Sequence, residues 1–197
     1  MSVTKRQLGE IADVYVGLPT MQSDIRGAGR SVKVLTVRAL TGNGINPEEL
    51  IQADLEKLRS QGREIDRYRA SAGEVLVSAR STSLKTAIVP RELDGVIINA
   101  TLIGVRCHSV LDPRLLLAYL RHPEGQAALS SVTQSATSQM NITVSALQTM
   151  SVPVPPIEVQ QQLAQILDAS DEAYHASLQA AETRRQLAIQ IIANRLK

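Results

Sequence analysis

The residues after Pro155 and Pro156 form a long stretch with no helix-breaking residue. From Ile157 to Lys197 there is no glycine and no proline, so nothing in the stretch interrupts a helix. Proline suits the first turn of a helix, and Glu158 complements the positive end of its dipole. The stretch therefore predicts a single helix of about 40 residues, about 60 Å long at 1.5 Å per residue.

Apolar and small side chains recur in this stretch at steps of three and four, which places them on one face of the predicted helix. A helix this long exceeds the domain that it leaves, so its apolar face needs a partner, and a second copy packed antiparallel would supply one. The alternative is that the helix folds back onto its own domain. The residues predicted to form the dimer contact are Leu163, Ile166, Leu167, Ala173, Tyr174, Leu178, Ala181, Leu187, Ala188, Ile191 and Ile192.

The residues before the helix predict one globular domain, so the expected division is residues 1–154 and residues 155–197. Its pattern indicates an α+β fold with a mixed β-sheet and flanking helices. Runs rich in β-branched residues predict strands at 31–40, 74–79, 85–90 and 95–107. Helical spacing predicts helices at 49–61 and 111–132, the second with Asp112 as its N-cap and Pro113 in its first turn.

Several protein classes are excluded by missing signals. No tract reaches the ~18 continuous apolar residues of a membrane span, and the first ten residues lack a signal-peptide core, so we expect a cytoplasmic protein. Cys107 lies in an apolar run and is expected to be a buried, inert thiol. We find no P-loop, complete dinucleotide-binding motif or zinc-ligand spacing. We therefore expect no catalytic residues, no metal and no cofactor in this chain.

Charge and aromatic content favour duplex DNA as a ligand. Residues 1–91 contain 14 Lys and Arg against 10 Asp and Glu, whereas residues 92–197 contain 7 against 9. The basic excess permits contact with a polyanion, although a solvated basic surface is the simpler interpretation. The chain has no Phe, no Trp and four Tyr, which disfavours stacking of unpaired bases.

Three polar loops are the candidate DNA-binding segments, because recognition residues usually sit on loops carried by a rigid scaffold. Arg pairs with guanine and Asn or Gln with adenine, whereas Lys and Ser suit phosphates. For any one of these residues, a solvated loop position remains the alternative. The candidates are Thr20, Gln22, Arg26 and Arg30; Arg80, Ser81, Thr82, Ser83 and Lys85; and Gln134, Ser135, Thr137, Gln139 and Asn141.

Five blocks in this order resemble one repeat of the specificity subunit of Type I restriction-modification systems. The blocks are LGEIADVYVGLPT, GEVLVSARSTSLKTAIVP, INATLIGVRC, DPRLLLAYLRHPEGQAALSS and QSATSQMNITVSALQTMSVPVPPIEVQQQLAQIL. The last is the most specific, because a Gln/Asn loop, a short helix, a strand ending in Pro-x-Pro-Pro and a Gln-rich helix start follow one another. The family usually has an acidic residue before the Gln after the prolines, where this chain has Val159.

The resemblance implies a non-catalytic target recognition domain that gives DNA sequence specificity to a methyltransferase subunit and a restriction (motor nuclease) subunit. Full-size members carry two recognition domains and two helices, whereas this chain resembles a half-length form. A homodimer with antiparallel helices would then read a bipartite palindromic site. Two alternatives remain open: a specificity-like interaction protein that modulates the methyltransferase without reading DNA, and a dimeric transcriptional regulator.

Overall fold

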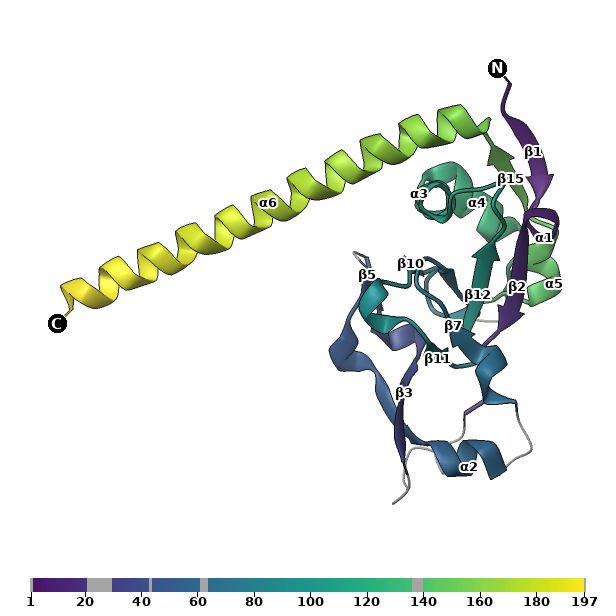
Figure 1. The fold of residues 1–197 in the computed structure, drawn as a ribbon, viewed down its shortest axis with the longest axis horizontal. Helices are drawn as coiled ribbons and strands as arrows, with labels where there is room; N and C mark the ends of the chain where they lie inside the picture. Colours follow the sequence, from purple (N-terminus) through teal and green to yellow (C-terminus); the bar gives the residue numbers. More distant parts are fainter. Residues whose placement is uncertain (1, 21–29, 43, 61–63, 136–139, 197) are drawn as a thin grey trace. The chain divides into compact units, whose positions relative to one another are not determined.

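The computed structural model describes residues 2–20, 30–42, 44–60, 64–135 and 140–196 (Figure 1). The chain divides into two compact units, Met1–Ile157 and Glu158–Lys197. The first unit contains several small sheets with helices packed around them, and the second is a single helix.

The central sheet of the first unit is antiparallel, with strand order β10-β8-β12-β2 (Figure 1). Its strand β8 is buried along its whole length, and alternate side chains enter different hydrophobic clusters: Val75 and Val77 enter one and Leu76 enters another. Both faces of this sheet are therefore covered. The strands are β2 (Ala12–Val16), β8 (Val75–Ser78), β10 (Thr86–Ile88) and β12 (Leu102–Cys107).

A second four-stranded sheet has the order β6-β3-β11-β7. Strands β3 and β11 run parallel, whereas the other two pairings are antiparallel, so the expected mixed sheet is confirmed. The strands are β3 (Ser31–Leu35), β6 (Ile51–Asp54), β7 (Arg69–Ala70) and β11 (Val96–Ile98). The predicted strand at 31–40 is thus shorter than expected and is followed by the 3₁₀ helix η2 (Val37–Ala39).

The predicted strand at 95–107 is two strands in two different sheets, so the prediction of one continuous run is wrong. Strand β11 pairs with β3, and β12 pairs with β8 and β2. Between them the Asn99 side chain accepts a hydrogen bond from the Thr101 amide at 2.9 Å, which turns the chain. Asn and Thr thus interrupt a run that is otherwise rich in β-branched residues.

The predicted helix at 49–61 is also wrong in its first half. Residues Ile51–Asp54 form β6, and only Leu55–Ser60 form a helix, α2. The Asp54 carboxylate accepts hydrogen bonds from the amides of Glu56 at 3.0 Å and Lys57 at 3.3 Å, so it caps α2. Pairing with β3 takes the preceding residues into the sheet despite their helical spacing.

The predicted helix at 111–132 consists of two helices, α3 (Pro113–Arg121) and α4 (Pro123–Ser131). The N-cap prediction is confirmed, since Asp112 Oδ1 accepts a hydrogen bond from the Arg114 amide at 2.8 Å. Pro123 ends α3 because it disfavours helical backbone at His122, and it then suits the first turn of α4. Gly125 lies against the end of α3: a Cβ there would be 1.9 Å from the Tyr119 carbonyl oxygen.

The two ends of the first unit lie side by side. Strand β1 pairs antiparallel with β15, the strand that precedes the proline step, from Thr4 opposite Val154 to Gln7 opposite Ser151. Thr143 caps the short helix before β15 by accepting from the Ala146 amide at 3.2 Å. The remaining elements of this unit are β1 (Thr4–Gln7), α1 (Leu8–Ile11), β4 (Leu40–Thr41), β5 (Gly44–Ile45), η3 (Pro47–Glu49), η4 (Ile65–Tyr68), β9 (Arg80–Ser81), η5 (Arg91–Leu93), β13 (Gln134–Ser135), β14 (Met140–Asn141), α5 (Val144–Gln148) and β15 (Ser151–Val154).

The second unit is the helix α6 (Ile157–Arg195), 39 residues long, which confirms the predicted single helix. Large hydrophobic side chains along it are exposed: Ile166 is 64% exposed and Ile192 is 59% exposed. Leu163, Tyr174, Leu178, Leu187 and Ile191 of the predicted dimer contact are exposed as well. Among the described residues, no helix combines the length and the apolar character that crossing a membrane requires.

Candidate nucleic-acid interface

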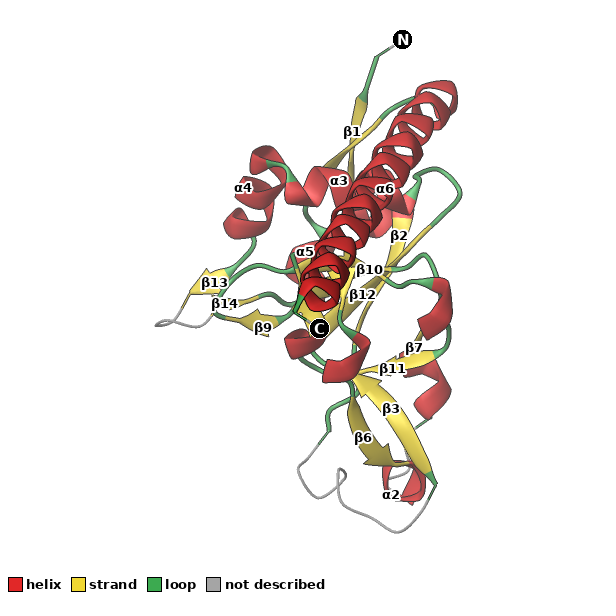
Figure 2. Cartoon of the chain, turned by 90° about the vertical axis from the view of Figure 1, so that its left-hand side faces the viewer, coloured by secondary structure: helices red, strands yellow, loops and turns green. Residues whose placement is uncertain are grey.

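Two of the three candidate loops meet in a small sheet with strand order β13-β14-β9 (Figure 2). Arg80 lies opposite Asn141, and Asn141 lies opposite Gln134, so three candidate base-reading residues follow one another across the sheet. Arg80 and Gln134 are exposed, and Asn141 is half-buried. Nothing in their sequence spacing indicates this juxtaposition, because it depends on strand pairing between distant segments.

The hydrophobic core holds this small sheet in place. Ala79 and Ile142, which flank the paired residues Arg80 and Asn141, are 4% and 3% exposed and belong to the same hydrophobic cluster. The Ile142 amide also donates a hydrogen bond to the Ala79 carbonyl at 2.8 Å. The polar residues therefore project from a fixed base, the arrangement typical of loops that carry recognition residues.

The turn between β11 and β12 joins one of these loops to the start of another. The Thr101 carbonyl accepts from the Ala79 amide at 2.8 Å, next to Arg80. On the other side of the turn, Asn99 Nδ2 donates to Thr20 Oγ1 at 3.3 Å. Sequence reasoning missed the positioning role of Asn99 and Thr101, although two turn-forming residues inside a β-branched run were a usable signal.

Gly17 permits the close approach on which this turn depends. A Cβ at this position would be 2.2 Å from the Asn99 carbonyl oxygen and 2.6 Å from the Ile98 carbonyl oxygen. Both are backbone atoms of β11 and the turn after it. Only glycine leaves room for the bridge between Leu18 and Asn99.

The first candidate loop lies only partly within the described structure. Gln22 and Arg26 fall outside the described residues, as do Thr137 and Gln139 of the third loop, and the Ser135 side chain is not described. Arg30 directly precedes β3, where its carbonyl accepts from the Leu55 amide at 2.9 Å. It lies five residues from Leu35, whose carbonyl binds Asn99, so about 16 Å of strand separates Arg30 from the turn. The structure does not bring Arg30 beside Thr20.

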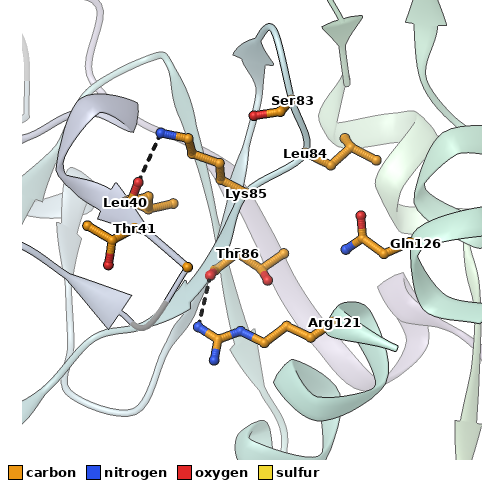
Figure 3. Close-up of a pocket in the computed structure, with 9 residues that line it drawn as sticks. Leu40, Thr41, Ser83, Leu84, Lys85, Thr86, Arg121 and Gln126 are labelled. Atoms are coloured by element: carbon orange, nitrogen blue, oxygen red, sulfur yellow. Dashed lines mark hydrogen bonds between the residues drawn. The ribbon is translucent and has the colours of Figure 1, made fainter. Parts of the chain in front are cut away.

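The second candidate loop also forms one wall of an open groove of about 480 Å³ (Figure 3). Ser83, Leu84 and Lys85 line it together with β4 and the facing residues Arg121 and Gln126. Figure 3 shows Arg121 extending from the end of α3 toward the Thr86 carbonyl, which accepts from Nη2 at 3.3 Å. Sequence reasoning missed Arg121 and Gln126, because neither lies in a polar loop.

A buried carboxylate organises a second polar group in the central sheet. Glu74 is 3% exposed and accepts hydrogen bonds from the Tyr15 hydroxyl at 2.7 Å and from Arg106 Nε at 2.8 Å. Burial and the neighbouring Glu74 raise the pKa of Tyr15, and the Glu74 hydrogen bond raises the pKa of Arg106. This group is internally satisfied, so we assign it a structural role.

The remaining observations concern the Cys107 thiol and possible metal ligands. Cys107 is half-buried, and burial, followed by the nearby charge of Asp112, raises the pKa of its thiol to about 11. In the part of the chain that the structure describes, no three His, Cys, Asp or Glu side chains are grouped so as to hold a metal ion.

A family model covers most of the chain. Residues 2–182 match the family described as the Type I restriction modification DNA specificity domain, and the chain belongs to that family. The sequence match thus agrees with the resemblance carried by the five blocks. No curated protein shows significant sequence similarity to the chain.

Solved structures of Type I systems share this fold. A chain from a study of complex assembly and conformational transition of the type I R-M system is similar with a TM-score of 0.63 and 22% identity, covering 94% of this chain and 42% of that one. The HsdS subunit from Thermoanaerobacter tengcongensis gives a TM-score of 0.58 and 22% identity, covering 88% and 38%. The S subunit of a Type I system from M. genitalium gives 0.55 and 15%, covering 87% and 40%. This chain therefore spans about two fifths of the length of the proteins that it resembles.

Proposed function

We propose that this chain is a DNA-sequence-recognition subunit of a Type I restriction-modification system, acting as a half-length specificity subunit. The observation that carries the proposal is the row Arg80, Asn141 and Gln134 across one small sheet, fixed to the core at Ala79 and Ile142. Membership of the DNA specificity family and the shared fold support it.

The chemistry of that row suits base edges in a duplex. Arg presents a planar fork of donors that matches O6 and N7 of guanine, and Asn or Gln matches N6 and N7 of adenine. Ser81, Thr82 and Ser83 continue the same turn with hydroxyl groups, which suit phosphate and sugar oxygens. We assign sequence reading to the row and positioning to the turn.

We further propose that α6 pairs antiparallel with the α6 of a second copy. Its exposed side chains Ile166, Leu178 and Ile192 support a helix partner, because burying each would stabilise the pair by roughly 1.5–3 kcal/mol. Two identical recognition domains would then lie at opposite ends of a helix pair about 60 Å long. Such a dimer would read an inverted repeat divided by an unspecified spacer.

The subunit is proposed to direct enzymes that it does not contain, a methyltransferase subunit and a restriction subunit. The decisive experiment expresses the chain with its methyltransferase and maps methylated bases by sequencing the genome of the host. We expect a bipartite palindromic motif. A continuous or asymmetric motif would refute the symmetric dimer, and unchanged methylation would refute the specificity role.

A gel shift separates DNA recognition from modulation of the methyltransferase. Duplexes with the mapped motif and with a scrambled motif are compared, with and without the methyltransferase. We expect preference for the mapped motif in the complex. Equal binding of the mapped and scrambled duplexes, both with and without the methyltransferase, would instead favour the interaction-protein hypothesis.

A further inference from the structure

The groove beside the second candidate loop carries two positive charges held by the backbone. Lys85 Nζ donates to the Leu40 carbonyl at 3.0 Å, and Arg121 Nη2 donates to the Thr86 carbonyl at 3.3 Å (Figure 3). No Asp or Glu of the described chain lines the groove, and among those residues neither cation forms an ion pair. Within the described structure, no carboxylate therefore compensates either charge.

The donors that remain on these side chains suit an anion. An ammonium group has three N–H donors and a guanidinium has five, and each has one hydrogen bond to a carbonyl here. Ser83 and Gln126 add neutral polar groups to the lining. Sites that contact DNA phosphates typically contain Arg, Lys and neutral hydrogen-bond donors and lack Asp and Glu.

The groove is continuous with the proposed base-reading row. Ser83 follows Arg80 by three positions in the same turn, and its amide donates to Ser81 Oγ at 3.4 Å. The groove is also open to solvent along about 480 Å³ of volume, which suits a passing polymer backbone. A duplex whose bases meet Arg80 would carry its sugar-phosphate backbone close to Ser83.

From these observations we infer that Lys85 and Arg121 each bind a backbone phosphate of the target duplex in this groove. The inference rests on the proposed function and adds to it a contact from α3, outside the three candidate loops. A phosphate contact carries no base information, so it contributes equally to target and unrelated sequences. It fixes the position of the duplex against the reading row.

The test measures the salt dependence of binding to a fluorescein-labelled duplex of unrelated sequence, with the full chain in complex with its methyltransferase. Each neutralised phosphate contributes a slope of about −0.9 to the plot of log Kobs against log salt concentration. We expect R121Q to reduce the slope by about 0.9 and to weaken binding about 5-fold at 0.15 M salt. K85Q should have the same effect. Each variant must lose affinity for the duplex with the mapped motif by the same factor as for the unrelated duplex, so that the ratio of the two affinities is unchanged.

The matched control is R59Q, which removes the same charge from α2, at the far end of the unit from α3 (Figure 1). An unchanged slope in R121Q and K85Q would overturn the inference, and so would an equal change in R59Q, which would indicate a net-charge effect. A loss of methyltransferase binding at an unchanged slope would identify the groove as a protein-docking surface and also overturn it. If the wild-type complex shows no sequence preference, the proposed function fails, yet the slopes still decide whether a phosphate binds here.

Discussion

Gly17 offers the sharpest test of how the turn between β11 and β12 positions the candidate interface. In the variant Gly17→Ala, the new Cβ would lie 2.2 Å from the Asn99 carbonyl oxygen, whereas ordinary contact begins at 3.4 Å. The atoms must therefore separate by about 1.2 Å. All three nearest atoms belong to the backbone, so no side-chain rotation relieves the overlap.

The expected cost follows from the contacts that must open. The Leu18 amide donates to the Ile98 carbonyl at 2.8 Å, and the Ala100 amide donates to the Leu18 carbonyl at 2.9 Å. Losing two such bonds costs about 1–3 kcal/mol in total, and overpacking a tight site costs typically about 1–3 kcal/mol more. We expect the free energy of unfolding to fall by about 4 kcal/mol, or Tm to fall by roughly 8–16 °C for a chain of this size.

The assay is urea and thermal unfolding followed by circular dichroism, at one protein concentration because a dimer would make Tm concentration-dependent. The control is Gly42→Ala, where a Cβ meets no atom of the described residues within 4 Å. We expect this control to lie within about 1 kcal/mol of the wild type. If Gly17→Ala were equally neutral, the close packing of the turn against Gly17 would be disproved.

Three further variants or reactions test other parts of the molecule. Asp112→Ala should lower the free energy of unfolding by about 1 kcal/mol at pH 7, and Asp112→Asn should lower it less, because Asn retains the cap. Arg114 lowers the pKa of Asp112, so the stabilisation by the carboxylate is present at neutral pH and is lost as the pH falls through that lowered pKa. If the stability of Asp112→Asn depended on pH as steeply as that of the wild type, this role would be refuted. Cys107 should react with iodoacetamide at pH 8 roughly a hundredfold more slowly in the native chain than in urea, because burial raises its pKa to about 11. Mass spectrometry measures both rates, and equal rates would contradict the burial. Leu178→Glu should raise the dimer dissociation constant at least about 10-fold by light scattering. The control Gln179→Glu should leave it unchanged, because no predicted contact residue lies three or four positions from Gln179 in α6. An unaltered dimer in Leu178→Glu would exclude α6 pairing through this face.

Local signals were sufficient for the elements that depend on neighbouring residues. The helix after Pro156 runs uninterrupted to Arg195 because no residue in it disfavours helical backbone. Asp112 caps α3 because the carboxylate reaches an amide only two residues away. Both interactions form within a few residues of chain, so the order of residue types alone predicts them.

Competition between local patterns and tertiary pairing explains the wrong boundaries. Residues 51–54 have helical spacing but pair with β3, and the run 95–107 divides its strands between two sheets. At residues 51–54 hydrogen bonds to a distant strand outweigh the local helical preference, whereas in the run 95–107 the turn at Asn99 lets each strand pair in a different sheet. The break between α3 and α4 is different, because Pro123 acts locally on the residue before it, and the prediction of one helix over 111–132 overlooked this signal.

The sequence by itself determined the long helix, the polar loops and the family to which the chain is similar, because each depends on residue types in order. Tertiary structure alone decided that Arg80 faces Asn141, that Thr20 meets Asn99, and that Arg121 joins Lys85 in one groove. Strand register and helix packing set these neighbours, and both arise from burial of Ala79, Ile142 and the core around them. The candidate interface is therefore a product of packing between segments that are distant in the chain.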